Sequence, residues 1–131
     1  MNTLESIVLP FPESRALAEA WIVLDTVAWW QRSLAHIDHP MSVHIKGDNS
    51  ELGIEDFFED VCPAPTLSEL LDAIREKVGN PLDERNIILA QDGRREVPCR
   101  AEVRYPSGEY RVAYNDTDLL AAAALLREVS R

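Results

Sequence analysis

Three histidines and a cysteine are the side chains of this sequence best suited to hold a metal ion. His36, His39 and His44 lie close together, and Cys62 follows further along the chain. Imidazole nitrogens and thiolates are zinc ligands, but a structural zinc site needs four well-placed ligands, and Pro40 interrupts the helical face that His36 and His39 would share. We therefore expect ordinary loop histidines, with no bound metal and no other cofactor.

Catalytic chemistry has little support in the sequence. Cys62 and Cys99 have no recognisable base motif beside them, and Cys99 is predicted to point into the core, where a thiol is usually inert. Glu55 and Glu59 have the i,i+4 spacing of two acids on one helix face, but no predicted pocket accompanies them. The sequence also has no phosphate-binding loop and no dinucleotide-binding motif. We therefore expect a protein that is not an enzyme.

An acidic segment that contains two phenylalanines is the strongest candidate for a binding surface. Its members are Asp48, Glu51, Glu55, Asp56, Phe57, Phe58, Glu59 and Asp60. Such a surface could bind a basic patch on a partner protein, with the aromatic rings as anchors. The alternative is a solvated helix face whose phenylalanines belong to the core. A near match to a calcium-binding loop fails at Leu52, where an oxygen ligand is needed.

The net charge keeps the binding interpretation open. The chain of 131 residues has a formal net charge of −10, and its first 65 residues, with 11 acidic and 3 basic side chains, contribute −8. Phosphate backbones and anionic membranes repel such a chain, so we expect neither direct nucleic-acid binding nor membrane binding. Two cysteines and no evident signal peptide favour a cytoplasmic location.

Three tryptophans form a second candidate interface on a predicted first helix: Trp21, Trp29 and Trp30. Neighbouring residues on a helix are about 100° apart, so Trp29 and Trp30 cannot both lie centrally on one narrow core stripe. One of them is then placed either at an interface between copies of the chain or in a wide core.

A group of arginines is the third candidate. They lie on and before a predicted hairpin: Arg94, Arg95, Arg100, Arg104 and Arg111. Arginine forks could bind phosphate or an acidic partner. The alternative is cross-strand pairing with Glu102 and neighbouring acids, because opposite charges on a solvated sheet face commonly pair.

Apolar periodicity predicts the elements that would position these side chains in the first half. A long first helix is expected from an N-cap at Ser14 to about Ala35, ended by His39 and Pro40. A short strand is expected over 41–45, a turn over 47–50 and a short acidic helix over 54–61. The proline-rich stretch that follows is expected to be extended, with a joint at 62–66 inside a single domain, 1–131.

The second half shows clearer signals. Thr66 and Glu69 have the form of a capping box at the start of a helix, and a short strand is expected over 86–90. A β-hairpin follows, and then a helix capped by Asn115 or Asp116. The predicted inner face of the hairpin is Cys99, Ala101, Val103, Tyr105, Tyr110, Val112 and Tyr114. The predicted fold class is α+β, with three main helices packed on a small, mainly antiparallel sheet and a C-terminal β-hairpin followed by a helix.

Three segments of the second half carry a resemblance: the run 63–71, the hairpin turn 105–110 and the Ala/Leu-rich stretch 119–123. With them, the chain resembles small proteins of unassigned function encoded by phages and prophages. The resemblance carries no catalytic residue to this chain. It implies a genomic setting in which accessory genes often encode small, acidic proteins that bind host or defence proteins.

These observations predict a small, acidic, cytoplasmic interaction protein of the phage or prophage type. It would bind a host or defence protein that has a basic surface, and it could inhibit that protein as an anti-CRISPR protein does. The alternative is a structural or assembly protein that homo-oligomerises through a Trp-rich first helix.

Overall fold

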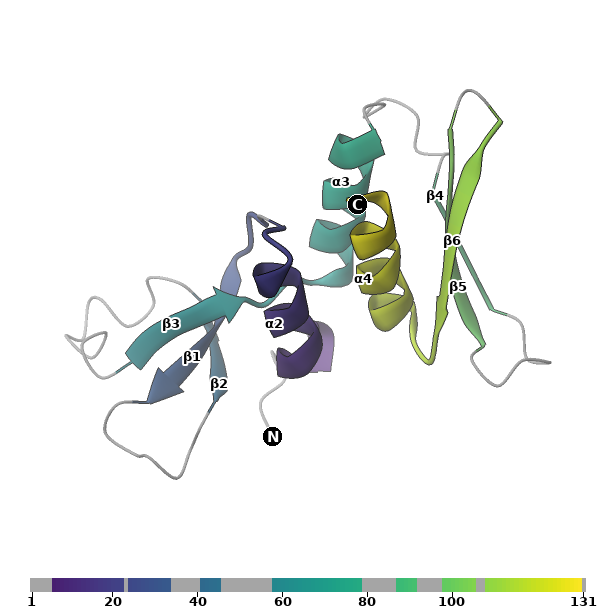
Figure 1. Ribbon diagram of the computed structural model, residues 1–131. Coiled ribbons are helices and arrows are strands. Elements are labelled where there is room, and N and C mark those ends of the chain that lie inside the picture. Colours follow the sequence, from purple (N-terminus) through teal and green to yellow (C-terminus); the bar gives the residue numbers. More distant parts are fainter. Residues whose placement is uncertain are drawn as a thin grey trace. The chain divides into compact units, whose positions relative to one another are not determined.

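The structure is a computed structural model, which describes residues 6–22, 24–33, 41–45, 58–78, 87–91, 98–105 and 108–130. The chain forms two compact units, Met1–Thr66 and Leu67–Arg131. In the described residues, each unit has one three-stranded antiparallel sheet and at least one helix, so the predicted α+β class is confirmed, with two small sheets (Figure 1). The boundary between the units follows the proline-rich stretch, and movement about a joint at 62–66 stays a prediction.

The first unit combines helix α2 with a sheet of strand order β2-β1-β3. The bounds are α2, Phe11–Glu19; β1, Ala28–Ser33; β2, Ser42–Ile45; and β3, Phe58–Pro63. Trp30 on the central strand lies opposite Val43 on one side and Cys62 on the other. The register between β1 and β3 then shifts between Trp30 and Gln31, which leaves Val61 as the extra residue of a β-bulge.

One face of this sheet forms the core of the first unit. Its buried members are Val8, Ala28, Trp30, Val43, Cys62 and Ala64. Alternate residues of a strand share a face, and Ala28 and Trp30 therefore both point to this side. The ring of Phe11 in α2 meets the ring of Trp30 edge-on, with 5.8 Å between the centroids. Aromatic packing thus joins the start of α2 to the central strand.

The long first helix predicted from Ser14 to about Ala35 is wrong. The N–H of Ile22 bonds to the carbonyl of Leu17, and the N–H of Trp21 bonds to the carbonyl of Ala18, both over 3.1 Å. These two bonds form the Schellman motif, which ends α2 at Glu19. The chain then continues as β1, in which aromatic and β-branched residues are favoured.

The predicted start of this helix is wrong as well. Pro10 is the N-cap residue and Phe11 is the first helical residue. Pro12 lies in the first turn, where a backbone N–H has no partner within the helix, so the N–H that proline lacks costs no hydrogen bond. The hydroxyl of Ser14 lies inside the helix and donates to the carbonyl of Leu9 over 2.9 Å. The predicted stop at His39 and Pro40 lies outside the described residues.

The acidic helix predicted over 54–61 is wrong where the structure describes it. Residues from Phe58 onward form β3 and pair with β1, so backbone bonding to a neighbouring strand replaces bonding within a helix. Residues 54–57 and the predicted turn 47–50 lie outside the described residues. The strand predicted over 41–45 is confirmed as β2, in which Val43 is buried.

The second unit combines two helices with a sheet of strand order β4-β5-β6. The bounds are α3, Leu67–Val78; β4, Ile87–Gln91; β5, Cys99–Arg104; β6, Tyr110–Asn115; and α4, Asp118–Val129. The helix after Thr66, the strand near 86–90, the hairpin and the last helix are confirmed. The cap of α4 differs from the prediction, because the side chain of Thr117 accepts the bond from the N–H of Leu120.

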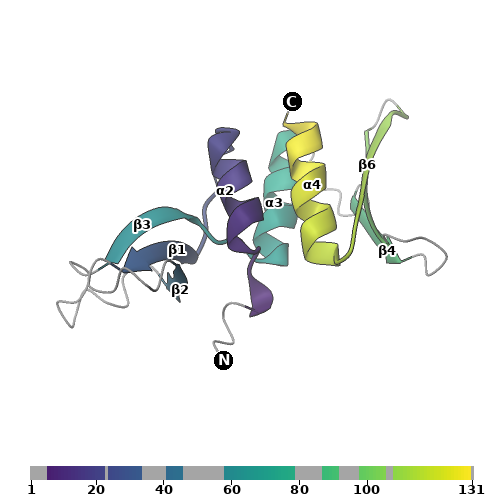
Figure 2. The same ribbon diagram turned by 60° about the horizontal axis from the view of Figure 1, so that its bottom comes forward.

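Helix α4 is the middle layer of this unit. Figures 1 and 2 both show α4 between α3 and the sheet. Its buried side chains point to more than one side: Ala121, Ala122, Ala123, Leu125 and Leu126. A helix that is apolar all round suits such a position, whereas α3 buries the single stripe of Leu70 and Ile74.

The hairpin register differs by one residue from the predicted one. The N–H of Tyr105 bonds to the carbonyl of Glu109 over 2.8 Å, so three residues separate this pair, and Gly108 among them has φ +92°. Val103 consequently lies opposite Arg111. A shift of one residue turns every side chain of a strand to the other face. The predicted inner face is therefore right for Cys99, Ala101 and Val103, and wrong for Tyr110, Val112 and Tyr114.

Candidate functional site

The acidic segment is described only in part. Asp48, Glu51, Glu55, Asp56 and Phe57 lie outside the described residues. Phe58, Glu59 and Asp60 lie on β3, where Asp60 is exposed and accepts a hydrogen bond of 2.6 Å from Gln31. Residues 58–60 therefore do not form a helix face, and a binding role for the segment stays a prediction.

The three tryptophans occupy three different environments. Trp30 is 8% exposed and belongs to the core, and Trp29 is half-buried on the opposite face of β1. Trp21 is 91% exposed. All three lie beyond the end of α2, so a first helix does not bring them together.

The backbone of Trp21 has a conformation that favours glycine. Trp21 follows the C-cap residue Ala20 and has φ 60°, in the left-handed region. This is the Schellman position usually taken by glycine, and another residue there costs about 1–2 kcal/mol. Ile22 and Leu17, the two positions of this motif that usually pack together, are both buried, whereas Trp21 is exposed. Stability therefore does not account for an exposed indole at this position.

A pocket of about 430 Å³ opens beside Trp21. The described residues that line it come from α2, from the turn after it and from the bulged part of β3: Arg15, Ala18, Glu19, Trp21, Val61 and Cys62. The ion pair between Arg15 Nε and Glu19 Oε1, over 2.9 Å, is largely exposed. The pocket therefore has apolar side chains in its wall and charged side chains on its solvent side. A protein interface likewise has an apolar centre and a polar rim.

The thiol in this pocket is not activated as a nucleophile. Burial raises the pKa of Cys62 to about 11, although the positive charge of Arg15 opposes the shift. Near neutral pH the side chain is thus an uncharged, weakly polar part of the pocket wall. Cys99 in the second unit is buried as predicted, and its pKa is raised by burial and then by the nearby carboxylate of Asp118.

A polar row crosses the other face of the first sheet. Gln31 lies opposite both Ser42 and Asp60, and its Nε2 donates to Asp60 Oδ1. On β2, Ser42 Oγ lies 2.7 Å from His44 Nε2. His44 is predicted to be a loop residue, although alternation along the strand predicted over 41–45 places Ser42 and His44 on one face. A serine beside a histidine has the geometry of a nucleophile and a base, but the carboxylate of Asp60 is held by Gln31 on the far side of β1.

The remaining metal and arginine candidates are described only in part. His36, His39, Arg94 and Arg95 lie outside the described residues. The part of the chain that the structure describes contains no cluster of three or more potential metal ligands from His, Cys, Asp and Glu. Arg104 Nε donates to Glu102 Oε2 over 3.0 Å, so this arginine pairs with an acid of its own strand and not across two strands as predicted.

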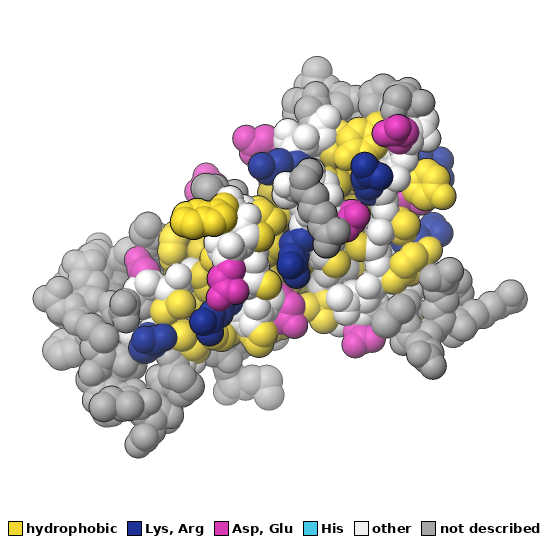
Figure 3. Space-filling view, viewed as in Figure 1, with side chains coloured by type: hydrophobic (Ala, Val, Ile, Leu, Met, Phe, Trp, Pro, Cys, Tyr) yellow, Lys and Arg dark blue, Asp and Glu magenta, His cyan; other side chains and the backbone are white. Residues whose placement is uncertain are grey.

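Figure 3 shows hydrophobic side chains among charged side chains of both signs on the described part of the face viewed. Among the described helices, none is long and apolar enough to cross a membrane. No protein-family model, curated protein or solved structure matches the chain.

Proposed function

We propose that this chain is an interaction protein whose first unit binds a partner protein through Trp21 and the pocket beside it. The observation that carries the proposal is the 91% exposure of Trp21 in a left-handed backbone conformation. Both properties lower the stability of the free protein, and contact with a partner offsets the exposure. Tryptophan is also the residue type most enriched among side chains that dominate binding energy.

The chemistry of the site suits a partner with an apolar recess and a basic surface around it. An indole that becomes fully covered loses about 150–250 Å² of exposed surface, worth about 4–6 kcal/mol before the cost of association is subtracted. The pocket of about 430 Å³ would receive a side chain of the partner in return. The charge of −8 in the first 65 residues favours a basic partner surface and adds a salt-dependent attraction.

The resemblance to small phage and prophage proteins suggests which partners to test first. A host or defence protein would be inhibited if Trp21 occupied a recess that the protein needs for its own activity. The acidic segment 48–60 would then contribute to the rate of association through its charge.

The test compares the tagged wild-type chain with three variants in pull-downs from bacterial lysate, at low and at moderate salt. Trp21→Gly and Trp21→Ala remove the indole, and Val27→Ala shortens another exposed apolar side chain that does not line the pocket. We expect a single partner that is retained by wild type and Val27→Ala and lost with both Trp21 variants. Equal retention of this partner by all four proteins would refute the role of Trp21.

Native mass measurements on the same samples examine self-association. Wild type would then be recovered alone, at a multiple of its monomer mass, and Trp21→Gly would be recovered as a single copy. This result would show that the partner of Trp21 is a second copy of the chain. The homo-oligomer alternative would then hold for Trp21, whereas Trp30 would remain a core residue because it is buried within its own unit.

A further inference from the structure

The second sheet has one face that α4 does not cover. Pairing across the strands places Ala90, Arg100 and Tyr114 in one row, because each lies directly opposite the next. Directly opposed residues share a face, and the neighbouring residue Ala101 on the other face is fully buried, on the side of α4. Arg100 thus lies at the centre of a row on the face that points away from the core.

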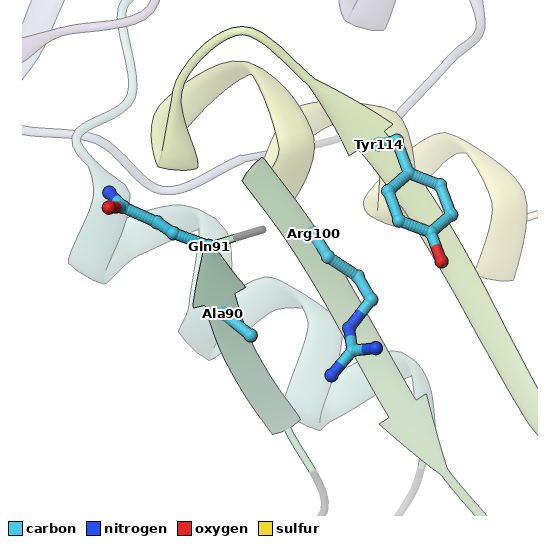
Figure 4. Close-up of a pocket in the computed structure, with 4 residues that line it drawn as sticks. All are labelled: Ala90, Gln91, Arg100 and Tyr114. Atoms are coloured by element: carbon cyan, nitrogen blue, oxygen red, sulfur yellow. The ribbon is translucent and has the colours of Figure 1, made fainter. Parts of the chain in front are cut away.

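A pocket of about 230 Å³ lies at this row. The described residues that line it are Ala90, Gln91, Arg100 and Tyr114 (Figure 4). Figure 4 shows the methyl group of Ala90 directed toward the guanidinium of Arg100, with the ring of Tyr114 on the neighbouring strand and Gln91 turned away. Because alanine is small, space remains beside the guanidinium.

Arg100 has a positive charge without a described counter-ion. Its side chain forms no ion pair in the described part of the chain, and its Nε is buried without a hydrogen-bond acceptor there. The nearest acid along its own face, Glu102, accepts a hydrogen bond from Arg104 instead. A half-buried guanidinium has lost part of its hydration, and an anion bound to it compensates this loss.

We infer that the pocket of Arg100 binds a carboxylate group. Because Nε is enclosed, the terminal nitrogens of the guanidinium are the donors that would meet the two carboxylate oxygens in a bidentate pair. Ala90 and the ring of Tyr114 would lie beside the ion pair and reduce its exposure to water, which strengthens it.

Charge and size favour a carboxylate over a phosphate. One guanidinium balances the single negative charge of a carboxylate, whereas a phosphate dianion would remain partly uncompensated on a chain of net charge −10. A volume of about 230 Å³ suits a group of several heavy atoms, since one water molecule takes about 30 Å³ in the liquid. Both a small free monocarboxylate and an acidic side chain of a protein meet these requirements.

The experiment is an NMR titration of the full-length, isotope-labelled chain with four probes. Butyrate represents the free carboxylate, a short glutamate-rich peptide represents the acidic side chain, and butyramide and inorganic phosphate are the neutral and phosphate controls. We expect saturable shifts of the amide signals of Ala90, Arg100 and Tyr114 with butyrate, with the peptide or with both. The stronger of these two probes identifies the source of the carboxylate.

The variants assign the response to Arg100. Arg100→Gln should weaken binding at least about tenfold, and Arg100→Lys should give an intermediate loss because it keeps the charge without the fork. Arg111→Gln makes the same charge change at an exposed position outside the pocket and should have little effect. Unfolding midpoints of all variants verify that each is folded.

Two outcomes would overturn the inference: no saturable response to either carboxylate probe, or a response to phosphate or butyramide of equal strength. An equal loss in Arg100→Gln and Arg111→Gln would overturn it as well, because binding would then depend on overall charge. Trp21→Gly should leave this titration unchanged, so failure here is distinguishable from failure of the partner site in the first unit.

Discussion

The indole Nε1–H of Trp30 donates a hydrogen bond of 3.0 Å to the carbonyl oxygen of Leu9, which lies 21 residues earlier in the chain. The same oxygen accepts the bond from the Ser14 hydroxyl, so both of its lone pairs are used. The amide N–H of Leu9 donates in turn to the carbonyl of Pro65. Leu9 thus connects the start of α2, the central strand β1 and the end of the first unit.

This arrangement predicts that the two donors to Leu9 depend on each other. Trp30→Phe and Ser14→Ala should each lower the free energy of unfolding by about 1–2 kcal/mol, since one bond to the buried carbonyl remains. The double variant should lose about 1 kcal/mol more than the sum, because the carbonyl then has no partner from either side chain. Urea unfolding of the four proteins measures this coupling, and strict additivity would show that the two bonds are independent.

Local signals were sufficient for the helices and strands of the second half, though not for its hairpin register, and they were insufficient for most of the first half. The stripe formed by Leu70 and Ile74 and the alternation along 99–105 correspond to observed elements, because each pattern covers one whole element. The apolar residues after Ser14 have helical spacing, but a Schellman motif at Trp21 divides them between α2 and β1. This motif usually contains glycine, so its most recognisable signal is missing from the sequence.

The candidate sites show the same division. The residue types and their spacing predict Trp21 and Arg100 as members of a group of tryptophans and a group of arginines. They do not distinguish the exposed Trp21 from the buried Trp30, and they do not identify the pocket beside Arg100. The row of Ala90, Arg100 and Tyr114 depends on a hairpin register that the turn sets, and the predicted register was one residue off. Pairing partners that lie far apart in the sequence were therefore the missing information.

The hairpin register should depend on Gly108. Its φ of +92° disfavours any side chain, although an added Cβ would meet no described atom within 4 Å. Gly108→Ala should therefore cost about 1–2 kcal/mol through backbone strain alone. Urea unfolding measures the loss, and hydrogen exchange should show weaker protection in β5 and β6 than in α3. An unchanged stability would mean that the turn can adopt another conformation without cost.

Trp21→Gly should separate stability from binding. Removal of the left-handed strain gains about 1–2 kcal/mol, and the greater freedom of glycine in the unfolded chain cancels about half of it. We therefore expect the variant to be more stable than wild type by about 0.5–1 kcal/mol. Trp21→Ala keeps the strained conformation and should not show this gain. Thermal and urea unfolding test the comparison, and a marked loss of stability with Trp21→Gly would indicate that the indole packs within the free protein.

The raised pKa of Cys62 predicts a loss of stability in alkaline solution. In the unfolded chain the thiol titrates near its ordinary value of 9.0, whereas in the folded protein it titrates near 11. Between these values the folded state holds a proton that the unfolded state has released, so the free energy of unfolding falls as pH rises. Below pH 9.0 the contribution is fully present, and it decreases by about 2–3 kcal/mol by pH 11.

Cys62→Ala isolates this contribution from other groups that titrate in the same range. The variant should be less stable than wild type below about pH 8, because a buried group is removed, but the difference should narrow as pH approaches 11. Urea unfolding at a series of pH values gives both curves. Parallel curves would show that Cys62 does not titrate differently in the folded and unfolded states, and the thiol would then be accessible to water in the folded protein.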